Sequence, residues 1–347
     1  MVRVENISKN LGEFFLKDVS LHVDDGEYFM ILGPTGAGKT ILLETIAGIY
    51  PPDNGRVYLN NHDITRLPPR KRNIGMVYQD YMLFPHLTVK KNIRYGAKST
   101  NLSKQEISQK VNELADMLNI SNLLHRYPGT LSGGEKQRIA IARALIMDPE
   151  VLLLDEPLSA LDNETKAKLR KELRKIHTLT STTMVHVTHS FDEAFLLGSR
   201  MAIMNQGEIV QMGKPNDVFR KPNCKFAAEF LGVTNVFRGK SIVDNGIAYI
   251  DIDGLKVIST DRKDGQVYLS IRPEDILLSL KPLESSARNS FQGKVQEISD
   301  AGVIIRITVD IGVPFVAAIT RNSFLDMGLK EDMVVFLTFK SADVHVF

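Results

Sequence analysis

The feature that most constrains this chain is a glycine-rich loop at residues 33–40, between two apolar segments. The loop is Gly33-Pro34-Thr35-Gly36-Ala37-Gly38-Lys39-Thr40, which fits the pattern G-x-x-x-x-G-K-[ST]. Residues 28–32 before it predict a buried strand, and residues 41–46 after it predict a helix. Between a strand and a helix, such a loop directs several backbone N–H groups and a helix N-terminus at one phosphate. The alternative is an ordinary glycine-rich turn.

The last two residues of the loop specify the phosphate chemistry further. Lys39 is expected to reach the β- and γ-phosphates of a nucleotide, and Thr40 to offer its hydroxyl to Mg²⁺. The loop therefore predicts a nucleotide site with ATP and Mg²⁺ as cofactors.

Composition bounds the kind of protein. The chain has 347 residues, 43% of them apolar and 24% charged, which is typical of about two soluble globular domains. A net charge of +2 argues against a nucleic-acid partner. Met1–Asn10 lacks the apolar core of a secretory signal, no apolar run approaches ~18 residues, and Cys224 is the single cysteine. We therefore expect a soluble cytoplasmic protein that reaches a membrane only through a partner.

Hydrophobic patterning changes along the chain. Up to about Leu231, continuous apolar runs at 151–154 and 183–187 predict parallel strands covered on both faces, and residues 103–119, 135–147 and 164–177 predict helices. After Gly232 the runs are short and alternating, with hairpin signals at Asn245-Gly246, Asp253-Gly254 and Asp264-Gly265. The predicted fold class is α/β with a mostly parallel sheet over residues 1–231, followed by a small all-β domain over 232–347.

Two adjacent acids end the predicted strand at 151–154. Asp155 and Glu156 would lie at the carboxyl edge of a parallel sheet, where ligands bind. One carboxylate there can hold Mg²⁺ and the next can polarise an attacking water. Taken alone, the pair is equally consistent with a solvated acidic strand end.

A second glycine-rich string, Leu131-Ser132-Gly133-Gly134-Glu135, precedes the helix expected at 135–147. Ser132 and Glu135 have capping-box spacing, so a well-capped helix is one interpretation and a second anion site is the other. The string resembles the signature motif of ABC ATPases. The order along the chain is also similar to that family, with the phosphate loop, Gln79, the signature, Asp155-Glu156, Ser159-Ala160-Leu161-Asp162 and His189. The resemblance covers residues 1 to about 231 and implies a P-loop ATPase domain with a helical subdomain.

The resemblance implies roles for individual residues. Gln79 would touch the metal and the water, Asp162 would lie at a dimer seam, and His189 would hold the γ-phosphate. Ser132, Gly133 and Gly134 would contact the ATP bound to the other subunit. The implied assembly is a homodimer on the cytoplasmic face of the membrane, bound to a dimeric permease and, through it, to an extracellular substrate-binding protein.

Two further segments have counterparts in the family, one for the base of the nucleotide and one for a partner protein. The aromatic ring that stacks on adenine in the family corresponds to Leu11 here, so Leu11 packs on the base or Phe14 or Phe15 replaces it. Residues 80–89 follow Gln79 and are rich in large apolar groups, which suits either a core segment or the groove that receives a permease helix. We favour the groove for Leu83, Phe84 and Pro85.

The C-terminal part carries a second resemblance. Residues 271–276, Ile-Arg-Pro-Glu-Asp-Ile, resemble the OB-like regulatory domain of importer ATPases. Residues 284–347 resemble the molybdate-binding β-domain of molbindins, on the strength of Ser285-Ser286-Ala287-Arg288-Asn289, Ala317-Ala318-Ile319-Thr320 and Ser323. Hydroxyls and backbone N–H groups suit a compact dianion. A turn rich in small polar residues is the alternative.

The predicted function is the ATP-hydrolysing subunit of an importer for an oxyanion, molybdate or tungstate, with feedback inhibition by the imported anion. Sulfate, a sugar or another small solute are alternative substrates. A DNA-repair or translation ATPase would have coiled-coil insertions or two cassettes, an exporter ATPase normally lacks the β-domain, and a storage protein would not need the intact acids and His189.

Overall fold

The chain divides into two compact units, Met1–Val218 and Phe219–Phe347. The structure, a computed structural model, describes residues 1–99 and 102–347. Among these residues, no helix has the length and apolar character needed to cross a membrane. The domain boundary expected after residue 231 stays a prediction. Each unit has its own core and is described separately.

The first unit is built on a mostly parallel sheet with the strand order β10-β9-β3-β8-β7-β6, in which only β10 runs antiparallel to its neighbour. A second, antiparallel sheet has the order β2-β1-β4-β5. The strands are β1 (Val2–Asn10), β2 (Phe15–Val23), β3 (Tyr28–Leu32), β4 (Asn54–Leu59), β5 (His62–Asp63), β6 (Ile74–Val77), β7 (Val151–Asp155), β8 (Thr183–Thr188), β9 (Arg200–Asn205) and β10 (Glu208–Gly213).

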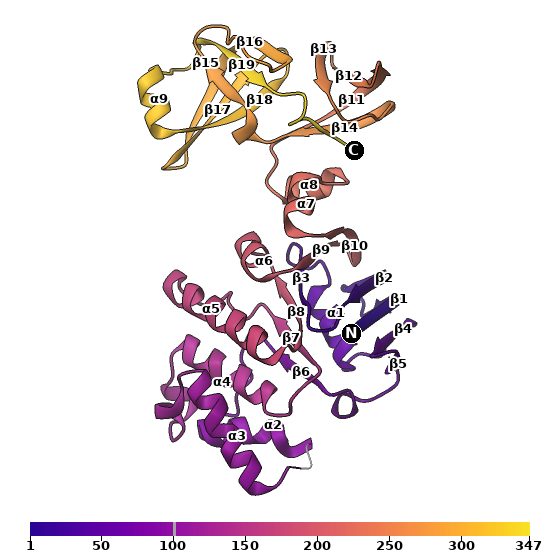
Figure 1. Ribbon diagram of the computed structural model, residues 1–347, viewed down its shortest axis with the longest axis vertical. Coiled ribbons are helices and arrows are strands. Elements are labelled where there is room, and N and C mark those ends of the chain that lie inside the picture. The colour runs from indigo at the N-terminus through magenta and orange to yellow at the C-terminus, as the bar shows by residue number, and fades with distance from the viewer. Residues whose placement is uncertain (100–101) are drawn as a thin grey trace. The chain divides into compact units, whose positions relative to one another are not determined.

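The helices of this unit surround the parallel sheet. They are α1 (Lys39–Ala47), α2 (Val89–Gly96), α3 (Lys104–Met117), α4 (Gly133–Leu145), α5 (Asn163–Thr180) and α6 (Phe191–Leu197), with α7 (Pro215–Arg220) at the boundary of the two units. Helix α1 packs between the two sheets, where apolar residues of β1, β2, β3 and β8 form one core with it. Helices α2, α3 and α4 gather beyond β6 as a helical subdomain (Figure 1).

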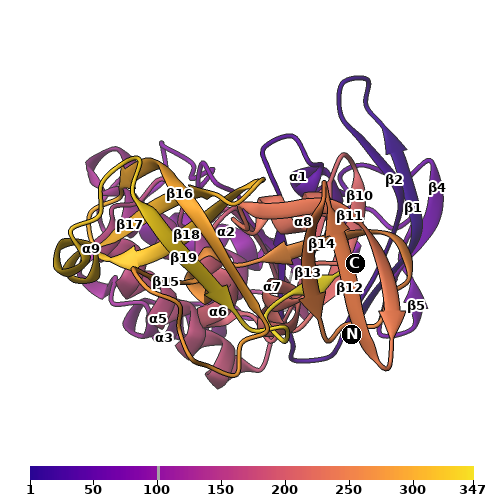
Figure 2. The same cartoon turned by 90° about the horizontal axis from the view of Figure 1, so that it is seen from above.

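The second unit contains two antiparallel sheets, with the orders β13-β12-β11-β14-β20 and β15-β19-β16-β17-β18, that share one core. Figure 2 shows α9 at one end of the second sheet. The elements are α8 (Lys225–Phe230), β11 (Asn235–Asp244), β12 (Ile247–Ile252), β13 (Leu255–Ser259), β14 (Gly265–Ile271), β15 (Leu277–Ser279), β16 (Asn289–Asp300), β17 (Ile304–Asp310), β18 (Pro314–Thr320), α9 (Arg321–Met327), β19 (Val334–Phe339) and β20 (His345–Val346).

The predicted fold class is confirmed, and one of the three predicted hairpins is wrong. The predicted strands appear as β3, β7 and β8, and the predicted helices as α1, α3, α4 and α5 with ends shifted by up to three residues. Turns at 245–246 and 253–254 join paired strands, as expected. The turn at Asp264-Gly265 does not, because β14 pairs with β11 and not with β13. A turn signal fixes a change of direction, whereas the choice of partner strand depends on the rest of the sheet.

A buried arginine anchors the C-terminus of α1. Arg72 is 2% exposed, and burial lowers its pKa to about 10. Its guanidinium donates to the carbonyls of Thr45 and Ile46 in the last turn of α1, at 3.0 and 2.8 Å, and to two carbonyls in the loop after β5, those of Thr65 and Leu67. A cation at this end also complements the helix dipole. Arg72 therefore fixes the helix that begins at the glycine-rich loop.

We expect Arg72→Met to lower the free energy of unfolding by about 3 kcal/mol, because several carbonyls lose a charged donor and stay buried. Arg72→Lys should recover little, since an ammonium cannot reproduce the planar fork. Urea unfolding followed by circular dichroism measures the change, with exposed Arg70→Met as the matched control. Equal stability of the Arg72 and Arg70 variants would refute the anchoring role.

Candidate nucleotide site

The glycine-rich loop joins β3 to α1, as its sequence predicts. Gly38 precedes α1 with a φ of 96°, a left-handed conformation that favours glycine. Lys39 is buried, and its ammonium donates to the carbonyls of Gly33 and Pro34 at 2.8 and 2.9 Å. Burial lowers the pKa of Lys39, and the carboxylates of Glu156 and Asp155 oppose this shift. The lysine charge is therefore held at the loop, beside both acids.

Thr40 and Asp155 lie together at the start of α1 and the end of β7. The Thr40 hydroxyl lies 3.1 and 3.0 Å from the two carboxylate oxygens of Asp155. Burial raises the pKa of Asp155, which the hydrogen bond from Thr40 opposes. Two hard oxygen donors suit Mg²⁺, which usually takes one or two protein ligands and completes its shell with phosphates and water. This pair therefore fits Mg²⁺, although the described residues contain no cluster of three His, Cys, Asp or Glu side chains placed to hold a metal ion.

Glu156 and His189 face each other at the same edge of the sheet. Glu156 follows β7 with a φ of 44°, a strained conformation for a residue with a side chain. Its carboxylate lies 3.3 Å from Nδ1 of His189, which follows β8 and is 59% exposed. Backbone strain of this kind is often found where a side chain must be aimed at a reacting group. The geometry brings together the acid and the histidine that the sequence analysis selected.

The remaining acidic and amide residues occupy neighbouring loops. Gln79 is exposed and follows β6, whose residue Val77 is in register with Leu154 just before Asp155. Gln79 therefore lies at the same edge of the sheet as Asp155. Asp162 caps α5, because its carboxylate accepts the Thr165 backbone N–H at 3.0 Å. The hydrogen bonds with Thr165 lower the pKa of Asp162.

The second glycine-rich string begins α4. Ser132 and Glu135 form the expected capping box, in which the Ser132 hydroxyl and backbone N–H both donate hydrogen bonds to the Glu135 carboxylate. A Cβ at Gly134 would lie 2.7 Å from the Thr165 methyl group, and one at Gly133 would lie 3.2 Å from a Leu161 methyl. The glycines thus allow close packing on the segment around Asp162.

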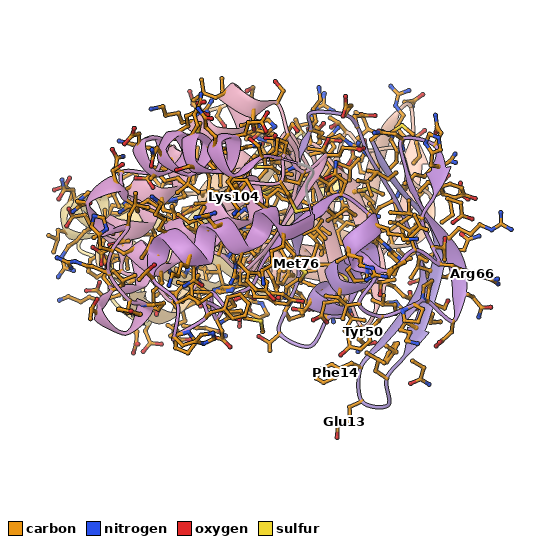
Figure 3. All side chains as sticks on the ribbon, turned by 90° about the horizontal axis from the view of Figure 1, so that it is seen from below. Glu13, Phe14, Tyr50, Arg66, Met76 and Lys104 are labelled. Atoms are coloured by element: carbon orange, nitrogen blue, oxygen red, sulfur yellow. The ribbon has the colours of Figure 1, made fainter. Side chains whose placement is uncertain are left out.

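The residues considered for base recognition lie in the β1–β2 loop. Leu11, Phe14 and Phe15 are 38%, 50% and 43% exposed. Figure 3 shows Glu13 and Phe14 extending from the tip of this loop, away from the body of the unit. The Phe15 carbonyl oxygen would lie 3.2 Å from a Cβ at Gly38, so Phe15 is beside the glycine-rich loop. All three side chains retain exposed apolar surface for a base.

A groove in the helical subdomain is lined by residues that come after Leu83, Phe84 and Pro85 in the chain, beginning at His86. It has a volume of about 470 Å³ and is lined by His86, Leu87, Lys91, Arg94, Tyr95, Ala97, Lys98 and Ile107. The Phe84 ring packs on the Tyr95 ring at 4.4 Å, and the Asn92 side chain fixes the Phe84 backbone. Pro85 is exposed, whereas Leu83 and Phe84 are half-buried.

The predicted oxyanion segment lies between β15 and β16 in the second unit. Ser285, Ser286 and Arg288 are exposed, and the Ser285 hydroxyl accepts the N–H of half-buried Ala287 at 3.3 Å. Asn289 differs, because its side chain is buried and bonded to both backbone polar groups of Ile258, at 2.8 and 2.9 Å. The Asn289 side chain therefore joins β16 to β13, and the part of Asn289 in oxyanion binding stays a prediction.

Three structural contributors escaped the sequence analysis. Arg72 anchors α1, and His186 and Glu193 lie buried beneath His189. A histidine within the apolar run at 183–187 was the available signal, because an ionisable side chain in a buried strand needs a partner. No feature of the local sequence distinguished Arg72, as a buried residue, from the basic residues around it.

Comparison with known proteins agrees with both units. The ABC transporter family model matches residues 16–159, and the TOBE domain model matches residues 285–346. The molybdate/tungstate import ATP-binding protein of Pyrococcus abyssi is 46% identical over 348 residues, covering 100% of both chains. The sulfate/thiosulfate import ATP-binding protein of Halalkalibacterium halodurans is 38% identical over 348 residues, covering 97% of this chain and 96% of that protein.

A solved structure supports the fold of the first unit. The dimeric post-hydrolysis state of an ATP-binding cassette bound to ADP and phosphate is 32% identical, with a TM-score of 0.56, and covers 62% of this chain and 99% of that one. Nucleotide binding by this fold agrees with the geometry of the loop, Thr40 and Asp155. The chain therefore belongs to the ABC transporter family, as an ATP-hydrolysing subunit of an importer with a C-terminal TOBE domain.

Proposed function

We propose that this subunit drives import of molybdate or tungstate. The observation that carries the proposal is the match to molybdate/tungstate import ATP-binding proteins across both units, the TOBE segment included. That segment presents the exposed hydroxyls of Ser285 and Ser286 and the exposed guanidinium of Arg288. Charge-assisted bonds from such groups suit a compact dianion.

The proposed hydrolysis uses the residues gathered at the sheet edge. Lys39 and the loop N–H groups bind the phosphates, and His189 contacts the γ-phosphate. Glu156 orients the attacking water and takes up its proton as the bond to the leaving phosphate oxygen breaks. Mg²⁺ would be held by Thr40 and Asp155, with Gln79 beside it, and would supply charge neutralisation. Leu11, Phe14 and Phe15 provide the apolar contact for adenine.

The proposed assembly is a homodimer that places Ser132, Gly133 and Gly134 of one subunit against the ATP of the other. Asp162 lies at the seam between the subunits. The groove beside Leu83, Phe84 and Pro85 receives a helix of a dimeric permease, which the extracellular substrate-binding protein contacts on its other side. The subunit is thereby peripheral, on the cytoplasmic face of the membrane. Nucleic acid has no part in this function.

Regulation follows from where the TOBE segment lies in such an assembly, on the side where the imported anion accumulates. We infer that an oxyanion bound near Ser285, Ser286 and Arg288 joins two regulatory units and holds the ATPase units apart. A ligand shifts this equilibrium only through its preference for the separated state. A preference of about 100-fold, roughly 2.7 kcal/mol, gives strong inhibition at saturation.

We expect molybdate and tungstate to lower the ATPase activity of the reconstituted transporter and to bind the full chain in calorimetric titrations. The Ser285→Ala/Ser286→Ala variant and Arg288→Ala should lose binding and inhibition together while basal turnover persists. Exposed Arg306→Ala, on β17, is the matched control. Sulfate titrated in parallel tests the main alternative substrate. Full occupancy without inhibition would exclude the regulatory part, and tighter binding of sulfate would exclude the proposed substrate.

A further inference from the structure

A buried polar chain crosses the face of the parallel sheet that is opposite α1. His186 of β8 is 0% exposed, and its Nδ1 lies 3.0 Å from the Tyr28 hydroxyl on β3. Its Nε2 lies 3.4 Å from the carboxylate of Glu193 on α6, which is 5% exposed. An unpaired ionisable group at this depth would be costly, so the three side chains depend on one another.

The protonation of the chain follows from its surroundings. Burial raises the pKa of Tyr28 well above its usual value, so the phenol stays protonated and pairs with Nδ1 of His186. Nε2 of His186 faces the Glu193 carboxylate at 3.4 Å. Burial would raise the pKa of Glu193, but the neighbouring side chains of His186, Thr188 and Lys166 together outweigh burial and lower the pKa. The carboxylate is therefore charged.

Glu193 connects this chain to the segment that carries His189. The Thr188 side chain accepts the Ser190 backbone N–H at 3.1 Å. The Ser190 hydroxyl in turn accepts the Glu193 backbone N–H at 3.5 Å. His189 lies between Thr188 and Ser190, and Ser190 is tied to Glu193 in the first turn of α6. The His189 ring itself remains 59% exposed, 3.3 Å from Glu156.

We propose that Glu193, His186 and Tyr28 are positioning residues that hold the segment Thr188–Ser190 and thereby aim His189 at the nucleotide. The inference rests on the role proposed above for His189. None of the three side chains touches the nucleotide in this scheme, because all are buried beneath the segment they hold. A buried group of side chains that joins β3, β8 and α6 explains how an exposed histidine keeps one orientation at the end of a strand.

The experiment measures ATP turnover by the purified full chain. Glu193→Ala should lower kcat by roughly 10- to 100-fold with KM for ATP within about twofold, because the phosphate-binding loop is untouched. Glu193→Gln keeps an oxygen acceptor facing His186, and it should recover most of the lost kcat. Tyr28→Phe removes only the far hydroxyl, so kcat should fall by about threefold. The exposed neighbour Asp192→Asn is the matched control and should keep wild-type kcat.

The His189→Ala variant separates this inference from the site assignment. Wild-type turnover in His189→Ala would remove the proposed role of His189 and the inference with it. Loss of turnover in His189→Ala together with wild-type kcat in Glu193→Ala and Tyr28→Phe would overturn the inference alone. The Glu193→Ala/His189→Ala double variant should be no slower than His189→Ala, and a further drop in kcat would show that Glu193 acts through another route. Since Tyr28→Phe is the mildest change, it keeps the test valid if Glu193→Ala fails to fold.

Discussion

Glu156→Gln is expected to lower kcat for ATP hydrolysis by roughly 10²- to 10⁴-fold, the contribution typical of a general base. The amide keeps the size of the side chain but cannot take up a proton from water. The contact with His189 at 3.3 Å and the loop around Lys39 stay in place, so ATP binding should persist. Steady-state turnover measures the loss, and gel filtration with ATP should show an accumulated dimer.

The matched control for this variant is Glu164→Gln, which alters an exposed glutamate on α5 that pairs with Lys168. It should hydrolyse ATP at the wild-type rate. Turnover within a few-fold of wild type in Glu156→Gln would assign the proton transfer to another group. Loss of ATP binding together with turnover would mean that Glu156 serves the loop structure and not the reaction.

Lys39→Ala is expected to weaken ATP binding by about 3 kcal/mol, roughly 150-fold, because it removes a partly desolvated charge from the phosphate site. In the structure the Lys39 ammonium donates hydrogen bonds to two loop carbonyls, those of Gly33 and Pro34. These bonds hold a positively charged donor at the loop that binds phosphate. Calorimetry with ATP measures the affinity. Lys168→Ala, on the exposed face of α5, is the control and should bind ATP normally.

Mixed dimers extend this prediction to the assembly. Ser132→Ala should reduce turnover more than ATP binding, because its effect falls on the nucleotide of the other subunit. A dimer with Lys39→Ala on one chain and Ser132→Ala on the other should keep at most one competent site. Two fully active sites in such a dimer would contradict the proposed sandwich.

The local sequence pattern was sufficient to predict a residue's structural role where that role depends on the residue's own segment. The strand, loop and helix around Gly33–Thr40 follow from apolar runs and glycine spacing, and Ser132 caps α4 through residues only three positions away. Strand ends at Asp155 and His189 could be assigned to one edge because parallel strands share their carboxyl ends. These predictions used information contained within about ten residues.

Partner choice between distant segments could not be predicted in this way. The hairpin expected at 264–265 failed because Gly265 pairs with Ser241 of β11 and not with the preceding strand. Asn289 lies in a segment of small polar residues that suits an anion, yet it joins β16 to Ile258 of β13. Both outcomes depend on which backbone groups remain unpaired after the sheets assemble.

The sequence by itself determined the α/β fold class, the phosphate-binding loop, the acids at the end of β7 and the family. Each motif is encoded by residues that are neighbours in the chain, and the order of the motifs along the chain indicated the family. Only the tertiary structure showed that Arg72 closes α1 and that Tyr28, His186 and Glu193 form one buried chain beneath His189. The contacts of Arg72 with α1 and of Tyr28 with His186 join positions 26 to 158 residues apart. Burial makes every polar group find a partner, and folding alone decides which distant partner is within reach.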